Sequence, residues 1–194
     1  MNSDIDFDAP LNDLEKTLSE LKAENLKIID LTISNPTMLG LDYTGLNIPG
    51  LLSSKENLFY HPDPKGNIKS RIAIKNYYLN RKNYFLFENE SNLFLASGTS
   101  ECYSLIFKLS GEPGNEVLLP APGYPLLEHL VKFDRLNPKY YRLDYTKNNW
   151  KINFDSVRDA ITKKTKFIVI VSPNNPTGHI LDKNEFYILD KICN

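Results

Sequence analysis

The spacing of hydrophobic residues changes along the chain, and each change predicts an element. Leucines recur at three- and four-residue steps over residues 10–25, which is typical of an amphipathic helix. Residues 27–33 form a short apolar run that predicts a strand, and a Gly- and Pro-punctuated loop follows to about residue 57. Helical spacing returns over residues 68–79. The first part of the chain therefore predicts two helices, one strand and long connections.

A regular alternation begins at residue 92. Short apolar runs predict buried strands because they are too short for most helices, and helical stretches of about ten residues separate them. The predicted strands span residues 92–96, 116–119, 140–145 and 167–171, and the predicted helices span 99–109, 125–133, 154–161 and 183–192. Strands that alternate with helices indicate βαβ units. The predicted fold class is therefore α/β with a mainly parallel sheet.

Composition narrows the possible partners. Of the 194 residues, 41% are apolar and 24% charged, as in ordinary globular proteins, and the net charge of −1 attracts neither nucleic acid nor an anionic membrane. Two distant cysteines, Cys102 and Cys193, make no disulfide framework and no zinc spacing, which favours a reduced, cytoplasmic setting. The acidic N-terminus does not resemble a signal peptide, and no apolar run reaches the length of a membrane span. No metal, nucleic-acid or membrane partner is expected.

A stiff polar turn, Ser172 to Gly178, follows the apolar run 166–171. Prolines fix φ and glycine permits positive φ, so Asn175 would be presented at a set angle, with an amide that both donates and accepts. Asp182, with Glu185 three positions on, predicts a capping box that opens the next helix. Ligands of open α/β sheets bind at this carboxyl edge. The alternative is a plain strand-to-helix turn, since these residue types are common in turns.

Two further strand-to-helix junctions carry candidate ligand-binding residues. Gly98, Thr99 and Ser100 stand where a helix begins, and free N–H groups there would suit an anion. The alternative is an ordinary N-cap without a ligand. Tyr124, between a glycine and a proline, would be held rigidly and could stack on a planar ligand, or else pack on a neighbouring loop. All three sites are expected at one edge of one sheet, which ordinary caps and turns do not require.

Four motifs, in this order, resemble those of class I and II aminotransferases, the fold-type I enzymes that depend on pyridoxal 5′-phosphate (PLP). They are Tyr60…Gly66…Arg71, Ser97–Ser100, Pro122–Pro125 and Asn174–Gly178, and the resemblance runs from about Asp30 to the end. It implies part of a three-layer α/β/α large domain, truncated before the last core strands. It also implies two regions: residues 1–60, an N-terminal arm with a small-domain and interface segment, and residues 61–194, the N-terminal part of the PLP-binding large domain.

The resemblance implies a cofactor role for five residues. Gly98, Thr99 and Ser100 would cradle the phosphate of PLP through their backbone and hydroxyl groups. Tyr124 would stack on the pyridine ring. Asn175 would donate to the 3′-oxygen of that ring.

Residues in the first region match other family positions. Tyr60 would reach the phosphate held by a neighbouring subunit, which implies a homodimer. Ser34 and Asn35 belong to the loop that approaches the substrate carboxylate in the family. Many relatives have glycine where Ser34 stands, so this sequence departs from the pattern there.

Other family residues have no counterpart before Asn194. They are the aspartate that pairs with the pyridine nitrogen, a second tyrosine, the Schiff-base lysine and the carboxylate-binding arginine. The resemblance therefore implies the N-terminal portion of an enzyme that passes an amino group from an amino acid to a 2-oxo acid, with no catalytic residue in this chain and no activity of the chain alone. Two alternatives stay open: a fold-type I lyase or decarboxylase, and a non-catalytic phosphate- or nucleotide-binding α/β module. Against the module, the chain lacks the glycine-rich nucleotide-binding patterns G-x-G-x-x-G and G-x-x-x-x-G-K-[ST].

The family topology also predicts how the strands pair. Strands 116–119, 140–145 and 167–171 would pair with one another, while strand 92–96 would need a partner beyond Asn194. Strand 167–171 would then present an open edge. Unpaired backbone groups and open apolar edges are costly, so the isolated chain is expected to be aggregation-prone or partly unfolded.

Overall fold

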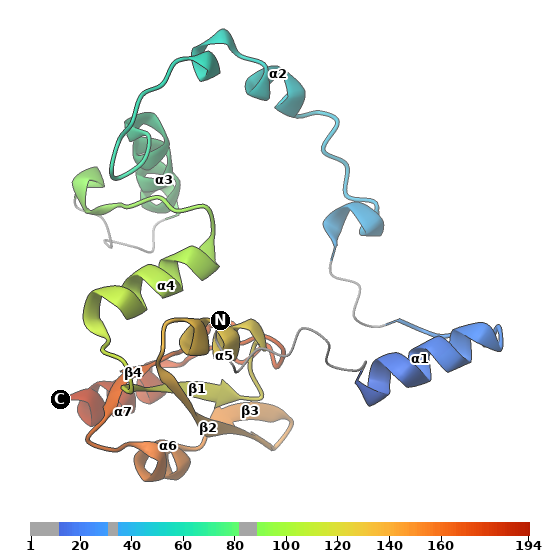
Figure 1. Ribbon diagram of the computed structural model, residues 1–194, viewed down its shortest axis with the longest axis vertical. Helices are drawn as coiled ribbons and strands as arrows, with labels where there is room; N and C mark the ends of the chain where they lie inside the picture. Colours follow the sequence, from blue (N-terminus) through green and yellow to red (C-terminus); the bar gives the residue numbers. More distant parts are fainter. Residues whose placement is uncertain (1–11, 31–34, 82–88) are drawn as a thin grey trace. The chain divides into compact units, whose positions relative to one another are not determined.

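The computed structural model describes residues 12–30, 35–81 and 89–194 (Figure 1). Their internal contacts divide them into two units, with the boundary between His61 and Pro62. No helix among these residues is long and apolar enough to cross a membrane, and no group of three or more His, Cys, Asp or Glu side chains among them could hold a metal ion.

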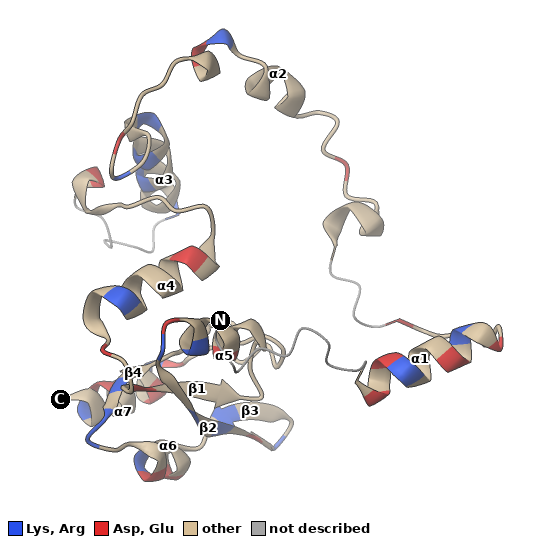
Figure 2. Ribbon diagram, in the orientation of Figure 1, with Lys and Arg blue, Asp and Glu red and all other residues tan. Residues whose placement is uncertain are grey.

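The described part of the N-terminal unit consists of short helices that form no core. Its elements are α1 (Asp13–Ala23), the 3-10 helix η1 (Pro36–Leu39), α2 (Ile48–Leu52) and the 3-10 helix η2 (Lys55–Leu58), and none contains a buried residue. Acidic and basic residues are intermixed along α1 (Figure 2). The strand predicted for residues 27–33 is wrong for residues 27–30, which form no strand because no described strand pairs with them. Residues 31–33 lie outside the described residues.

The second unit contains the remaining elements, which follow the predicted alternation closely. They are α3 (Ile68–Asn80), the 3-10 helix η3 (Glu90–Asn92), α4 (Thr99–Ser110), β1 (Glu116–Ala121), α5 (Leu126–Phe133), β2 (Asn137–Thr146), β3 (Asn149–Ile152), α6 (Phe154–Ala160), β4 (Thr165–Ile168) and α7 (Lys183–Cys193). Every helix predicted after residue 60 is confirmed. Strands 116–119 and 140–145 are also confirmed, as β1 and β2.

The sheet has the strand order β3-β2-β1-β4. β1 lies in the centre and pairs in parallel with both β2 and β4, whereas β2 and β3 pair antiparallel. The β1–β4 register shifts between Glu116 and Val117, so Glu116 faces Thr165 while Val117 faces Phe167. β4 therefore occupies residues 165–168, earlier than the predicted 167–171. It lies at the edge of the sheet, so the predicted pairing of the three parallel strands and the open edge of the fourth are confirmed.

Helices cover both faces of this sheet, as the ribbon shows for α5 and α6 on opposite sides of β1 and β2 (Figure 1). Successive side chains of β1 point to opposite faces, because the side chains of a strand alternate. Val117 and Leu119 pack with residues of α4 and α5 in one apolar cluster. Leu118 packs with residues of β2, β3, α6 and α7 in the other. The unit is therefore a three-layer α/β/α structure. The turn that carries Tyr124 follows the buried strand β1, and the turn that carries Asn175 comes after β4, which pairs with β1.

The antiparallel strand β3 is an element that the hydrophobic pattern did not predict. β2 and β3 form a hairpin in which Thr146 faces Asn149, so Lys147 and Asn148 form the two-residue turn. Both turn residues have positive φ, 50° and 64°, which is the conformation that tight hairpin turns require.

The strand predicted for residues 92–96 is wrong. Residues 93–96 are extended but pair with no described strand, and their environment is uneven: Leu93 is buried while Phe94 is 66% exposed. Two backbone hydrogen bonds hold the segment: the N–H of Leu93 donates to the carbonyl of Glu90 at 3.1 Å, and the N–H of Leu95 donates to the carbonyl of Lys65 at 2.9 Å. The physical reason is that a strand requires a neighbour, and the sheet ends at β4 on one side and β3 on the other.

Arg71 organises the region that precedes this segment. Its side chain is buried, and it donates to the carbonyls of Gly66 and Glu90, both at 3.0 Å, and to the Asp63 carboxylate at 3.1 Å. A planar guanidinium with five donors can join three backbone segments in this way. Arg71 therefore ties the turn before α3 to η3.

Candidate functional site

Four of the predicted residues line one cavity of about 400 Å³ in the second unit. Thr99 and Ser100 come from the first turn of α4, Tyr124 from the turn after β1, and Asn175 from the turn after β4. The rest of the lining is mainly apolar: Tyr103, Leu127, Leu130 and Val171. The volume is in the range of small-molecule sites, which are typically apolar with a few convergent polar groups.

The N-terminus of α4 is free to receive an anion. Its N-cap, Gly98, has an extended backbone and no side chain to cap the helix, whereas side chains cap α3, α6 and α7. The N–H groups of Thr99 and Ser100 donate no hydrogen bond to a described side chain. Orphan N–H groups at a helix N-terminus favour negative charge. Gly98 itself precedes the cavity lining and does not belong to it.

A carboxylate one position further along α4 reaches back to Ser97, the residue that precedes the N-cap. Glu101 accepts from the N–H of Ser97 at 2.6 Å and from its hydroxyl at 2.8 Å. These bonds favour the ionised carboxylate and hold the pKa of Glu101 below its usual value. The contact fixes the chain just before the N-cap, and the Glu101 carboxylate is bonded to Ser97 of the same segment.

Tyr124 lies in a turn that requires glycine at the preceding position, Gly123. A Cβ on Gly123 would lie 2.3 Å from the carbonyl oxygen of Pro120, well inside any allowed contact. The ring of Tyr124 is 44% exposed and lines the cavity. An exposed ring on a rigid turn can stack on a planar ligand.

Asn175 stands at the exposed part of a turn that is closed by backbone hydrogen bonds. The N–H of Asn174 donates to the carbonyl of His179, and the N–H of Gly178 donates to the carbonyl of Asn174, both at 2.7 Å. Gly178 has φ of 73°, which favours glycine. Asn174 is buried, whereas the side chain of Asn175 has no hydrogen-bond partner among the described residues. Its amide can therefore serve a ligand.

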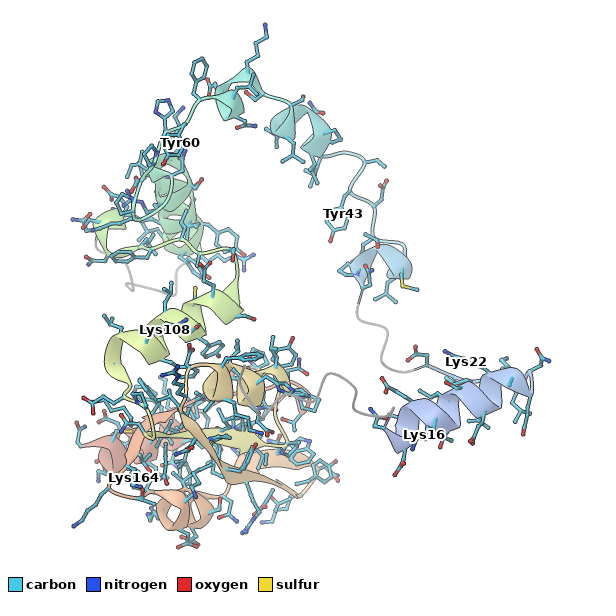
Figure 3. The ribbon with its side chains drawn as sticks, in the orientation of Figure 1. Lys16, Lys22, Tyr43, Tyr60, Lys108 and Lys164 are labelled. Carbon is cyan, nitrogen blue, oxygen red and sulfur yellow. The ribbon has the colours of Figure 1, made fainter. Side chains whose placement is uncertain are left out.

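The predicted residues of the first region that the structure describes, Tyr60 and Asn35, belong to the other unit. Tyr60, labelled in Figure 3, lies in the N-terminal unit and is 87% exposed. Asn35 caps η1, where its side-chain oxygen accepts from the N–H of Thr37 at 3.0 Å and from the hydroxyl of Thr37 at 2.7 Å. Ser34 lies outside the described residues. The roles of these three residues stay predictions.

The sequence interpretation missed two features of the site. Tyr103 lines the cavity one helical turn after Thr99, a spacing that places both on one face of α4. Burial raises the pKa of Tyr103, so its hydroxyl stays protonated at neutral pH. The second feature is a buried contact between His179 and Glu185 behind the turn that carries Asn175.

Solved structures of the same fold are aminotransferases of fold type I. Alanine aminotransferase from Pyrococcus furiosus superposes with a TM-score of 0.77 at 28% identity, over 93% of this chain and 46% of that one. A PLP-bound protein from Clostridium difficile 630 shares the fold with a TM-score of 0.63 at 21% identity, over 75% of this chain and 37% of that one. The fold is thus part of the α/β/α large domain of the fold-type I PLP-dependent transferases, as predicted.

The family model for aminotransferase class I and II matches residues 26–194. The chain belongs to this family, and the resemblance drawn from its four motifs is confirmed. The glutamate-pyruvate aminotransferase AlaA of Haemophilus influenzae is 30% identical over 170 residues, which are 88% of this chain and 41% of that protein. The chain therefore spans less than half the length of the curated relatives it matches.

Proposed function

We propose that this chain is the N-terminal portion of a PLP-dependent aminotransferase that passes an amino group from an amino acid to a 2-oxo acid in the cytoplasm. One observation carries the proposal: Thr99, Ser100, Tyr124 and Asn175, from three distant parts of the sequence, line one ligand-sized cavity. The names of the relatives favour amino transfer over the lyase and decarboxylase chemistries of the same fold.

The groups around the cavity support this proposal, because they include the donors and the aromatic ring that PLP would need. The uncapped N-terminus of α4, with Gly98, Thr99 and Ser100, would hold the phosphate, which needs N–H and O–H donors. The ring of Tyr124 would stack on the pyridine ring, and the amide of Asn175 would donate to the 3′-oxygen. When bound, the cofactor supplies an electron sink for bonds at the amino acid's α-carbon.

The chain alone is proposed to bind but not to transfer an amino group. No lysine is present among the described residues that line the cavity. Amino transfer through PLP requires an amine that anchors the cofactor and then moves a proton. In the whole enzyme, that lysine would come from residues that this chain does not contain.

The whole enzyme is proposed to be a homodimer. Tyr60 is exposed and therefore available to a second subunit, where it would reach the bound phosphate. The loop with Ser34 and Asn35 would approach the substrate carboxylate, and Asn35 would act by fixing the turn at η1.

Binding of 4′-deoxypyridoxine 5′-phosphate tests the site. This PLP analogue carries the same phosphate and ring but a methyl group in place of the aldehyde, so surface lysines cannot capture it. Tyr124→Ala should weaken binding roughly threefold to tenfold, since ring stacking contributes about 0.5–1.5 kcal/mol. Tyr187→Ala, which removes a tyrosine exposed on α7, is the matched control and should leave binding unchanged.

Three outcomes separate the candidate functions. Loss of binding in Tyr124→Ala and Asn175→Ala supports a PLP site. Binding that competes with inorganic phosphate but ignores both substitutions would favour the phosphate-binding module instead. Absence of any binding at millimolar analogue, by chain in which the N–H groups of β1 are protected from hydrogen exchange, would contradict the proposed cofactor site.

A separate experiment tests the proposed inactivity. Mixed with PLP and an amino acid, the chain should show no transamination and no specific lysine adduct after borohydride reduction. A borohydride-stable adduct at one defined lysine in the cavity would show that the catalytic amine lies within this chain. Diffuse labelling of exposed lysines would not, because any exposed amine reacts slowly with the aldehyde.

A further inference from the structure

We propose that His179 and Glu185 are positioning residues for Asn175, because this buried pair fastens the turn Ser172–Gly178 to the first turn of α7. The inference rests on the proposed function, in which the amide of Asn175 donates to the cofactor ring. Neither residue reaches the cavity, so neither would touch the cofactor itself.

The pair is buried and short. The side chains of His179 and Glu185 are 6% and 4% exposed, and Nε2 of His179 lies 3.0 Å from Oε2 of Glu185. The two atoms are close, although no described atom accepts a well-aligned hydrogen bond from Nε2. The charged group beside Nε2 is therefore the Glu185 carboxylate.

The carboxylate of Glu185 joins this turn to two other segments. Its Oε2 accepts from the N–H of Asp182 at 3.1 Å, which completes the capping box of α7. Its Oε1 accepts from the N–H of Ile152, at the end of β3, at 3.2 Å. Because two backbone donors fix the carboxylate, it gives the imidazole a rigid point of attachment.

On the other side, His179 is part of the turn that presents Asn175. Its carbonyl accepts from the N–H of Asn174, the residue next to Asn175, at 2.7 Å. Its N–H donates to the hydroxyl of Thr177 at 3.2 Å. These two bonds join the backbone of His179 to Asn174 and Thr177, on either side of Asn175, and the buried imidazole anchors the backbone that makes them.

The exposed amide of Asn175 has no partner of its own among the described residues, so its direction depends on this backbone. Burying an ionisable pair costs free energy that apolar residues would not, so such a pair is weak evidence for stability and fits a role in geometry better. The buried pair thus anchors one side of the turn, and the turn presents the exposed amide of Asn175 on the other side.

Hydrogen exchange in the ligand-free chain, at low micromolar concentration, tests the pair without reference to function. His179→Ala should raise exchange at the N–H groups of Asn174 and Gly178 about tenfold or more, while the N–H groups of β1 stay protected. His179→Gln should restore most of the protection, because its amide nitrogen can occupy the place of Nε2. Asp155→Asn is the matched control, since it removes a charge from an exposed pair with Arg158. Unchanged exchange in His179→Ala would overturn the inference.

The ionisation of a bound probe tests positioning itself. In 4′-deoxypyridoxine 5′-phosphate, the 3-hydroxyl changes the near-ultraviolet absorbance when it ionises. A hydrogen bond from Asn175 favours the ionised oxygen, so the bound midpoint should rise by about one pH unit in His179→Ala. The affinity, which depends mainly on the phosphate cradle, should change less than about threefold.

The outcomes of these two experiments are distinguishable. If wild-type chain and His179→Ala bind the probe with the same midpoint, the pair does not position Asn175 and the inference is wrong. If Glu185→Gln and His179→Ala both shift the midpoint and His179→Gln does not, the inference is supported. If the wild-type chain binds no probe, the proposed function fails, and the exchange result alone decides whether the pair orders the turn.

Discussion

The segments 93–96 and 117–119 have similar apolar sequences, Leu-Phe-Leu-Ala and Val-Leu-Leu, but only the second forms a strand. β1 has β2 on one side, β4 on the other and helices over both faces, and its residues 117–119 are at most 2% exposed. Residues 93–96 pair with no described strand, and Phe94 is largely exposed. An apolar pattern thus indicates that a segment is suited to the interior. The segment becomes a buried strand only where neighbouring strands are present to pair with it.

The largest effect expected from this difference concerns the whole chain. With one apolar segment unpaired and an open edge at β4, the isolated chain should be aggregation-prone or partly unfolded. Light scattering after size exclusion and a thermal scan would measure both properties. A soluble monomer with a sharp, reversible two-state transition would contradict this expectation.

A pair of substitutions would measure the contrast directly. Leu118→Ala removes a fully buried side chain and should cost about 2–5 kcal/mol, because it leaves a cavity in the second apolar cluster. Phe94→Ala should change stability by no more than about 0.5 kcal/mol, since the ring is mostly exposed. Urea unfolding followed by the fluorescence of Trp150, the single tryptophan, would report both values. Equal costs would mean that residues 93–96 are packed as well as β1.

A smaller loss of stability is expected when a buried polar group is removed than when a buried apolar side chain is removed, and none is expected for an exposed polar group. The hydroxyl of Tyr141 is buried and donates to the carbonyl of Val169 at 3.0 Å, just past β4. Tyr141→Phe should cost about 0.5–1.5 kcal/mol, because one hydrogen bond is lost inside the core. Tyr187→Phe on the exposed side of α7 is the control and should be neutral. The same urea midpoints measure both, and a neutral Tyr141→Phe would show that the Val169 carbonyl finds another donor.

The smallest effect concerns pH and the residues before α4. The pKa of Glu101 is lower in the folded chain than its ordinary value, because the backbone and hydroxyl of Ser97 donate to it. A lowered pKa stabilises the fold above the ordinary value and loses that contribution as pH falls through the folded value. Glu101→Gln should therefore flatten the fall in thermal midpoint from about pH 5 to pH 3. An unchanged pH profile would show that this contact contributes nothing measurable.

Sequence patterns predicted the core of the fold because local spacing and strand pairing agree there. They missed β3 because its hairpin turn is Lys147-Asn148, without the glycine that usually marks such turns. They placed β4 two residues late because the register shift beside Glu116 is invisible in one strand alone. The strand prediction for residues 93–96 was wrong for a related reason, because the pattern of one segment does not show whether a second segment pairs with it.

For the site, the sequence predicted the convergence of Tyr124 and Asn175 because the parallel strands β1 and β4 bring their carboxyl ends to one edge. Thr99 lines the same cavity although the segment before α4 is not a strand of the sheet. It identified Glu185 only as part of a capping box. The contact of Glu185 with His179 was not predictable, because it depends on how the turn folds back over α7. The role of Tyr60 depends on a second subunit and stays a prediction.

The strand order β3-β2-β1-β4 has a consequence for the time at which the sheet can form during synthesis. Every strand of the sheet lies between residues 116 and 168, and each pairs with the strand next to it in sequence or with the central one. Short separations between contacting segments favour fast folding, and domains fold as they leave the ribosome. The sheet and its helices could therefore assemble once α7 has emerged. The turns of Tyr124 and Asn175 would then be in place early, as a template on which later contacts form.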